Sequence, residues 1–349
     1  MPYSKQCPFC GETLTIDEVA QAVRCGACGS AFAPEELRVQ SEEEVLRLLG
    51  EQAKEETERD GFLCENCGAQ LIADETAGAT FCCFCGAPAM QPAPIPDTIE
   101  PELALPFAVD RREAQDRFVH WFGRKKLISP AFLETAKAGR ISGVYVPFWL
   151  FDCAMETQLH AVSSTTETVR SEQDEAVTAK EYYHYRAVKS DFTAVPTDAS
   201  ERIDARLMTL LGPFDLTQLE PFDPACMEGI FAQKNSLTLQ QAFAQAREQL
   251  EAAARHAAQE ALETQSYARV SSCRHCYEHI QAKYALLPVW IMTCSDRGFT
   301  HQFFMNGQTG KIVGETPLSL SRSLQWFGGI AAAAAAAGEL IWLALDKLL

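Results

Sequence analysis

The sequence predicts an α+β protein that consists of two small cysteine-rich modules at the N-terminus, a duplicated antiparallel-sheet/helix body and a C-terminal apolar helix. Three observations lead to this prediction: a repeated pattern of paired cysteines, a repeated apolar segment and an alanine-rich run close to the C-terminus. A chain of 349 residues with 47% hydrophobic content has room for two or three domains and at least one buried core.

The cysteine pattern is the strongest signal. Two sets of CxxC pairs share one spacing, with fourteen residues between the pairs of each set: Cys7, Cys10, Cys25 and Cys28, then Cys64, Cys67, Cys82 and Cys85. Two cysteines on a tight knuckle place both sulfurs on one ion, and a second knuckle completes a tetrahedron. The pattern predicts two zinc ribbons, residues 1–33 and 62–88, each with one structural Zn²⁺. Rubredoxin-like iron and unliganded core thiols are the alternatives.

The redox compartment follows from the first residues. MPYSKQCPFC contains no apolar segment of the kind that a secretory signal has, so we expect a reducing cytosol. In that compartment CxxC pairs bind metal rather than form disulfides. Four thiolates also leave no open coordination position, which favours a structural ion over a catalytic one.

The charge of the chain disfavours nucleic acid as a partner. The formal net charge is -17 and the pI is about 4.9. Residues 1–33 carry two basic and three acidic side chains, net -1, and residues 62–88 carry three acidic and no basic ones, net -3. Affinity for phosphate backbones comes largely from Lys and Arg. Residues 34–61, between the ribbons, are expected to form an acidic helical spacer.

A proline-rich segment, residues 89–103, is expected to be an extended linker. The body, 104–320, contains a second repeat: VYVPFWLFDC (144–153) and ALLPVWIMTC (285–294) align Pro, Trp and Cys and are expected to be buried strands. An amphipathic helix that starts at an Asp cap is expected at 110–126, with Trp121 in the core, and an alanine-rich helix is expected at 237–265. The repeat cysteines, Cys153 and Cys294, are interpreted as small buried hydrophobic residues, with a metal or redox pair as the alternative, and the extra Cys83 as a spare thiol.

Two further motifs could be functional sites. Cys273, Cys276 and His279 form a candidate third site, for which the alternatives are metal binding, a redox dithiol and an unliganded turn. GQTGK, residues 307–311, lacks the glycine spacing of a P-loop and has Ile312 after the lysine, so we expect a tight turn and no nucleotide. No other catalytic motif is recognised, and the protein is not expected to be an enzyme.

The C-terminal segment, 322–347, is long enough for a transmembrane-like helix, although alanine is barely apolar and Glu339 is costly in lipid. Insertion would make it a tail anchor and place the rest of the chain on the cytoplasmic face of the cell membrane. The alternatives are a buried or oligomerising helix and a protein of the soluble cytoplasm.

The CxxC knuckles, GVYVPFWLFD, YALLPVW, MNGQTGKIVGE and the apolar tail together resemble a bacterial family of TFIIB-type zinc-ribbon-containing proteins, often labelled as primosomal helicases. No ATPase motif supports that label. The resemblance implies a membrane-associated accessory protein, encoded in some members beside flotillin-like and phage-shock proteins. The second ribbon and the CRHC segment depart from the single-ribbon form.

From these observations we expect a non-enzymatic adaptor, tethered to the membrane by its last helix, whose ribbons dock protein partners, flotillin-like or phage-shock-type proteins among them. Two alternatives belong to other classes. One is a nucleic-acid-associated zinc-ribbon factor of the transcription or replication type. The other is a thiol oxidoreductase that uses Cys273 and Cys276.

Overall fold

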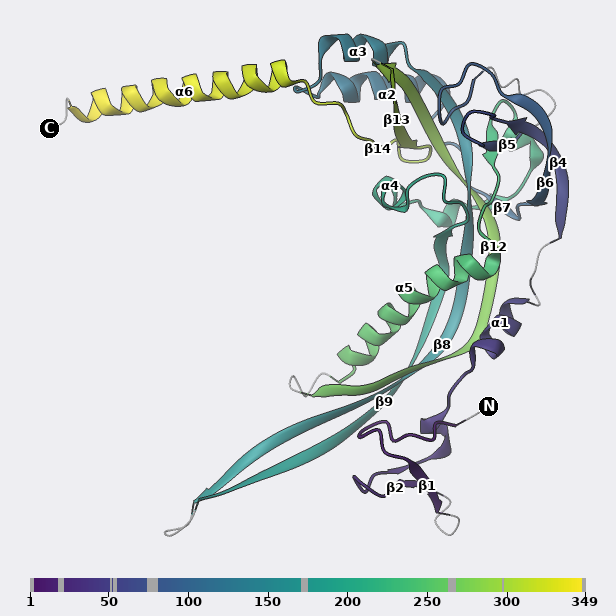
Figure 1. Cartoon of the computed structure of the whole chain (residues 1–349), viewed down its shortest axis with the longest axis vertical. Coiled ribbons are helices and arrows are strands. Elements are labelled where there is room, and N and C mark those ends of the chain that lie inside the picture. Colours follow the sequence, from purple (N-terminus) through teal and green to yellow (C-terminus); the bar gives the residue numbers. More distant parts are fainter. Residues whose placement is uncertain are drawn as a thin grey trace. The chain divides into compact units, whose positions relative to one another are not determined.

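A computed structural model describes residues 3–17, 22–50, 52, 55–73, 81–170, 175–262, 268–296 and 298–346 (Figure 1). Residues 74–80 of the expected second ribbon and residue 347 of the expected C-terminal helix lie outside the described residues. In the described part the protein is α+β, with six α-helices and a large mixed sheet of eleven strands. The chain forms two compact units, each assembled from three segments.

Unit 1 comprises residues 1–55, 148–199 and 236–284. Its N-terminal segment forms a separate three-stranded sheet in the order β1-β2-β3, with Leu14 opposite Cys25. The elements of this segment are β1 (Leu14–Asp17), β2 (Ala22–Cys25), β3 (Ala31–Phe32), the 3₁₀ helix η1 (Pro34–Leu37) and α1 (Glu42–Gly50). A small core around Phe32 and Leu37 stabilises this first ribbon.

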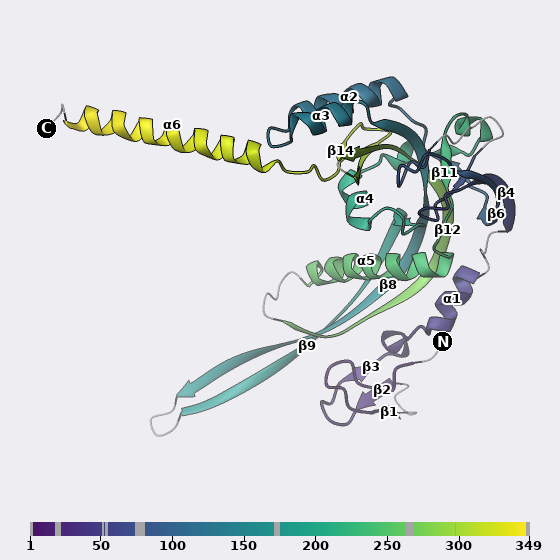
Figure 2. The same cartoon turned by 45° about the horizontal axis from the view of Figure 1, so that its top comes forward.

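The remainder of unit 1 consists of long antiparallel strands and one long helix (Figure 2). Strand β8 (Arg140–Arg170) pairs with β9 (Glu175–Asp198), and β12 (Arg269–Asp296) is the neighbour of β8 in the sheet. The helix α5 (Leu239–Glu260) begins at a capping box formed by Thr238 and Gln241. It buries a stripe of small and apolar side chains: Ala242, Phe243, Ala246, Leu250, Ala254 and Ala258. The helix predicted at 237–265 is therefore present, but it ends at Glu260, and residues 263–265 of the prediction lie outside the described residues.

Unit 2 comprises residues 56–147, 200–235 and 285–349. Its short strands are β4 (Glu56–Leu63), β5 (Gln70–Ile72), β6 (Gln91–Ile99), β7 (Leu103–Ala104), β10 (Glu220–Pro221), β11 (Phe231–Gln233), β13 (Phe299–Asn306) and β14 (Ile312–Val313). Its helices are α2 (Arg111–Gly123), α3 (Pro130–Lys137), α4 (Ala205–Leu211), η2 (Leu216–Gln218), η3 (Pro224–Met227) and α6 (Leu320–Asp346). The strand order is β10-β7-β12-β8-β11-β5-β4-β6, and β13 pairs with β12 and β14.

The main core of unit 2 lies where α2 and α3 cover β12 and β13 (Figure 1). The predicted cap of α2 is present, because the Asp110 carboxylate accepts a hydrogen bond from the Glu113 amide at 2.8 Å. Phe118, Phe122 and Phe132 are fully buried, and the ring of Phe122 meets that of Phe303 edge to face at 4.7 Å. Trp121 is partly buried against the same core, so its predicted core position is confirmed in part.

The proline-rich segment is not a linker. It forms β6, which pairs antiparallel with β4, Gly61 lying opposite Ala93 and Phe62 opposite Pro92. β6 is the last strand in the order, so one of its sides has no neighbouring strand. Prolines at alternate positions are tolerated there, because the N–H group that each of them lacks would have faced this unpaired side. The segment 34–61 is likewise not one helical spacer, since α1 ends at Gly50 and β4 starts at Glu56.

The repeated apolar segments lie on β8 and β12, which are neighbours in the large sheet, as the sequence predicts. Trp149 and Trp290 are both buried, at 1% and 5% exposure. The cysteines of the repeat, Cys153 and Cys294, are buried as well, and burial raises their thiol pKa values, so the interpretation as small core residues is consistent with the structure. The two compact units do not coincide with two consecutive half-domains, because each unit combines three separate segments.

The GQTGK segment forms the predicted tight turn between β13 and β14. The buried Asn306 side chain accepts hydrogen bonds from the amides of Gln308 and Thr309, both at 2.9 Å. The ammonium group of Lys311 donates to the carbonyl oxygen of Gly212 at 2.7 Å, at the end of α4. The lysine that suggests a nucleotide-binding loop thus connects the β13–β14 turn to the end of α4.

The C-terminal segment is helical, but the expected membrane crossing is not supported. Within the described residues, no helix combines the length and apolar composition that a membrane crossing requires. Residues 331–337 are all alanine, which contributes little hydropathy, and Glu339 interrupts the apolar run. The part of α6 up to Glu339 is almost entirely exposed, and Lys126 lies over the Trp326 ring at 4.5 Å near its start.

Candidate metal centres

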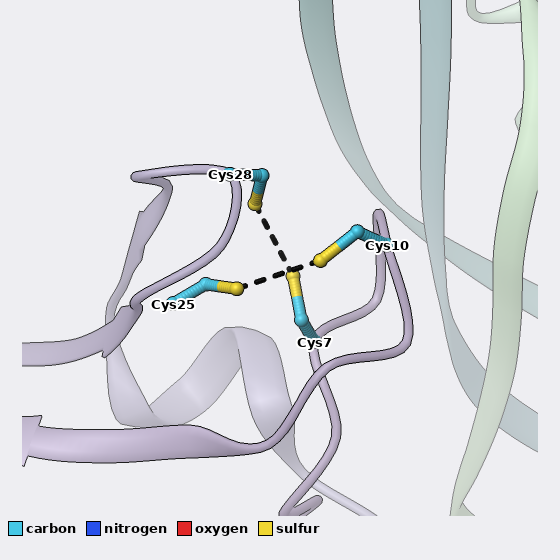
Figure 3. A group of neighbouring side chains, drawn as sticks. All are labelled: Cys7, Cys10, Cys25 and Cys28. Carbon is cyan, nitrogen blue, oxygen red and sulfur yellow. Dashed lines mark hydrogen bonds between the residues drawn. The ribbon is translucent and has the colours of Figure 1, made fainter.

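The first cysteine set forms a compact group of sulfurs. Figure 3 shows the four side chains converging from two loops of the first ribbon. The Sγ atoms of Cys7 and Cys28 are 3.6 Å apart, and those of Cys10 and Cys25 are 3.4 Å apart. Cys7 and Cys25 are buried, Cys28 is partly buried and Cys10 is exposed.

The second set repeats this geometry in unit 2. The Sγ atoms of Cys64 and Cys85 are 3.6 Å apart, and those of Cys67 and Cys82 are 3.7 Å apart. Here Cys64 and Cys82 are fully buried and the other two ligands are partly buried. In the described part of the chain, these two sets are the groups whose ligand atoms all lie within 4.8 Å of one another.

Each of the four knuckles is built by the same backbone hydrogen bonds. The amide of the glycine after each pair donates to the carbonyl of the first cysteine, at 2.8 to 3.0 Å. These glycines have φ values of +69° to +80°, a conformation that side chains with a Cβ rarely adopt: Gly11, Gly29, Gly68 and Gly86. The sequence therefore specifies the knuckle locally, twice in each set.

The sulfur positions fit a tetrahedral metal ion. With Zn–S bonds of about 2.3 Å, the sulfurs of a tetrahedron lie roughly 3.8 Å apart, close to the 3.4 to 3.7 Å found here. A disulfide would bring two sulfurs to about 2.05 Å, and the cysteines of both sets are free. The donor set and its geometry therefore fit Zn²⁺, with four thiolates and no position for water.

The two sets contain thiols of contrasting acidity. Backbone amide donors, that of Cys28 foremost, lower the pKa of Cys25 to about 7, whereas burial raises that of Cys7 to about 12. In the second set burial raises the pKa of Cys82. Burial also opposes ionisation of Cys85, but hydrogen bonds from the Asn66 side chain and the Ala87 amide outweigh it and lower its pKa to about 6. In each set, one ligand thiol thus ionises more readily than a buried neighbour.

The first ribbon packs against the long strands of its own unit. Phe9, between Cys7 and Cys10, meets the rings of His160 and Tyr183 at centroid distances of 5.1 and 4.8 Å. His160 is fully buried, and burial together with the charge of Arg274 lowers its pKa to about 4. Its two ring nitrogens have no partner among the described residues. The knuckle therefore rests on a neutral imidazole.

The second centre is part of the sheet of unit 2 rather than a free-standing ribbon, which corrects the expected 62–88 domain. Its β5 pairs with β4 and β11. Cys83 is a buried thiol at 1% exposure, and burial raises its pKa to about 12. Its carbonyl accepts a hydrogen bond from the Thr293 hydroxyl. Cys83, interpreted from the sequence only as a spare thiol, is thus a core residue beside the ligands.

Three residues that contact the second centre are absent from the sequence-based predictions: Thr293, Gln302 and Arg202. A signal for this burial does exist, since the knuckle CCFC encloses the apolar pair Cys83 and Phe84, where the preceding knuckle encloses Glu65 and Asn66. An apolar pair at that position indicates a knuckle that faces a core. The spacing of the ligands contains no information about which strands form that core.

The candidate third site does not assemble. Cys273, Cys276 and His279 all lie on strand β12. Side chains alternate between the faces of a strand, so Cys273 and Cys276 point to opposite sides. Cys273 approaches His275 (Sγ to Nε2, 3.6 Å), whereas the Cys276 sulfur is directed at the Arg38 carbonyl oxygen at 4.0 Å. Burial raises both thiol pKa values, contrary to what a reactive dithiol requires.

An α+β chain with two four-cysteine groups of this geometry is a protein with zinc-ribbon-like sites. The chain belongs to the same family as a protein of Bacillus subtilis (strain 168), described as the uncharacterized protein YdjG. The two are 30% identical over 345 residues, which cover 95% of each chain. No family model matches the sequence, and no solved structure matches it.

Proposed function

We propose that the protein is a non-enzymatic zinc-ribbon scaffold, an adaptor that binds protein partners. The observation that carries the proposal is the closed coordination of both cysteine sets, in which four sulfurs converge with the spacing of a tetrahedron. An ion with four thiolate ligands has no position for a water molecule or a substrate. Its contribution is folding energy and the shape of the surface around it.

The charge of the protein supports a polypeptide partner with a basic surface. The chain has a net charge of -17, and each zinc ion with four thiolates adds a further local excess of negative charge. Such a surface repels phosphate backbones and steers basic proteins toward itself. The flotillin-like and phage-shock-type proteins suggested by the family resemblance are the partners we propose to test first, and they would provide a membrane location without a spanning helix.

Metal analysis is the first test. The purified full-length chain should bind two equivalents of zinc, and its cobalt-substituted form should have the absorption of a four-sulfur tetrahedral site. In-cell crosslinking should then capture one of these proteins with the wild type and lose it when two of the three acidic side chains of the first ribbon, Glu12 and Asp17, are replaced by Gln and Asn. Salt-sensitive DNA or RNA binding at physiological ionic strength, with no protein captured, would instead support a nucleic-acid factor.

A further inference from the structure

The two cysteine sets share one spacing but lie in different surroundings. The first belongs to a separate three-stranded sheet, and its ligand Cys10 is exposed. The second lies within the large sheet of unit 2, where its ligands Cys64 and Cys82 are fully buried. Residues on both sides of the second set determine how firmly its knuckles are held.

One knuckle of the second set is tied to β12 and β13 by three consecutive carbonyl groups. The hydroxyl of Thr293 donates to the Cys83 carbonyl, the amide of Gln302 to that of Phe84, and the hydroxyl of Thr300 to that of Cys85. Cys83 and Phe84 are buried at 1% and 4% exposure. Opening this knuckle would break these bonds and expose two apolar side chains to water.

The other knuckle of the second set contacts an arginine. The Arg202 guanidinium donates to the carbonyl oxygen of Cys67 at 3.2 Å and lies 3.8 Å from its sulfur. It also lies over the Phe84 ring, 5.5 Å from the centroid, so it connects the two knuckles. A donor beside a thiolate disperses the negative charge of a four-sulfur site and holds the ligand in place.

The knuckles of the first set have fewer direct ties in the contacts that the structure describes. The knuckle 7–11 meets the long strands of unit 1 through the Phe9 ring, which contacts His160 and Tyr183. The hydrogen bonds from those strands to this segment lie outside the knuckle, from Arg274 to the Ser4 hydroxyl at 3.0 Å and from Gln158 to the Glu35 carbonyl oxygen at 2.8 Å. Ring contacts of this kind carry no directional hydrogen bond to the knuckle backbone. Release of an ion requires that a thiolate leave it, which in turn requires that a knuckle open, and local opening is easiest where the fewest contacts must break.

We infer that the two metal ions have different roles. The ion of the second centre is a permanent structural ion of unit 2, whereas the ion of the first centre is exchangeable and responds to the supply of Zn²⁺. Thr293, Gln302 and Arg202 are positioning residues for the ligands of the second centre. The inference rests on the proposed zinc scaffold. It assigns any dependence of partner binding on zinc supply to the ribbon of residues 1–33.

The test measures zinc release from the full-length, zinc-loaded protein into excess EDTA, followed by removing samples and quantifying the zinc that remains bound. We expect two phases of one equivalent each, with rates that differ at least tenfold. Cys10→Ser should remove the fast phase, and Cys67→Ser should remove the slow one. Release of both ions in a single phase, or loss of the slow phase in Cys10→Ser, overturns the inference.

Variants of the positioning residues show whether slow zinc release depends on these contacts or on the overall stability of the protein. Gln302→Leu should accelerate the slow phase at least fivefold and leave the fast phase unchanged, while Gln259→Leu on the exposed side of α5 should change neither. Thr293→Val, which keeps the side-chain shape, serves if Gln302→Leu does not fold. Arg202→Met should accelerate the slow phase, and Arg202→Lys should accelerate it less. Slow phases equal to wild type in all of these variants contradict the assignment.

The outcome also separates this inference from the proposed function. If two equivalents of zinc are bound and both are released in one phase, the different roles of the two ions are overturned and the proposed scaffold function stands. Fewer than two equivalents, or a cobalt spectrum that indicates a bound water, would overturn the scaffold itself, and the inference would fail with it.

Discussion

The indole Nε1 of Trp290 donates a hydrogen bond of 2.9 Å to the carbonyl oxygen of Val109. Its counterpart in the internal repeat, Trp149, is equally buried, but its Nε1 has no partner among the described residues. Two tryptophans at corresponding positions therefore differ in a single hydrogen bond. An unpaired buried donor costs free energy, whereas a paired one contributes to stability.

This difference predicts unequal costs for the same substitution. Trp290→Phe should lower the free energy of unfolding by about 2 kcal/mol more than Trp149→Phe does, since only the former leaves a buried carbonyl without its donor. Both changes remove the same side-chain volume, so each serves as the control of the other. Urea unfolding followed by circular dichroism measures the two costs, and equal values would contradict the role of the Val109 contact.

Cys85, a ligand of the second set, and Cys83, two residues before it, should respond differently to alanine. Cys85→Ala removes a ligand, so the purified protein should bind one equivalent of zinc instead of two. Cys83→Ala removes a buried thiol that is not a ligand, and the protein should keep both equivalents while losing about 1 to 2 kcal/mol of stability. Metal analysis of the two variants provides the comparison. Loss of an ion from Cys83→Ala would mean that the ligand assignment is wrong.

Asp198, at the end of β9, should make stability depend on pH. Burial raises its pKa from the usual 3.8 to about 6, so between these values the folded chain holds a proton that the unfolded chain has lost. This carboxyl therefore favours folding least above pH 6. Asp198→Asn should raise the free energy of unfolding at pH 7.5, by about 1 to 2 kcal/mol because the group is partly exposed, and much less at pH 4.5.

The matched control for this prediction is Asp191→Asn, an exposed position on the same strand. Unfolding of both variants should be measured at both pH values with zinc in excess, so that loss of metal at low pH affects them alike. A gain for Asp198→Asn that is the same at pH 4.5 and 7.5 would show that charge is not its cause.

Asn306 should be the most sensitive position of the β13–β14 turn. Its amide donates to the carbonyl oxygens of Leu211 and Pro213 at 3.3 and 3.4 Å, and its carbonyl accepts two amides of the turn. Asn306→Ala should therefore lower the unfolding free energy by about 3 kcal/mol or more. Thr309→Ala, which keeps the backbone contact, should cost well under half as much. Thermal unfolding of the two variants decides the matter.

Local patterns predict the parts of the structure that are locally determined. The CxxCG knuckles, the Asp110 cap of α2 and the Asn306 turn all depend on neighbouring residues and are recognisable in the sequence. The repeat of apolar residues also indicates two buried strands, and β8 and β12 are adjacent in the sheet.

Predictions failed where the outcome depends on distant partners. Prolines at alternate positions resemble a linker, yet they fit the outer side of β6 once β4 is beside it. The second ribbon has the spacing of the first, but its surroundings come from strands more than two hundred residues later, such as the one that contains Thr293. The CxxC of β12 resembles a metal or redox site in the sequence. On a strand, however, side chains alternate between the two faces, so its two thiols point in opposite directions.

The path of the chain through the two units has a consequence for experiments with fragments. The chain passes between them at residues 55/56, 147/148, 199/200, 235/236 and 284/285. Strands β8 and β12 thus run from one unit into the other without a break. Neither unit can be cloned as one continuous fragment. The shortest fragment that contains all of unit 1, residues 1–284, also contains two of the three segments of unit 2, so deletion analysis cannot assign a property to one unit alone.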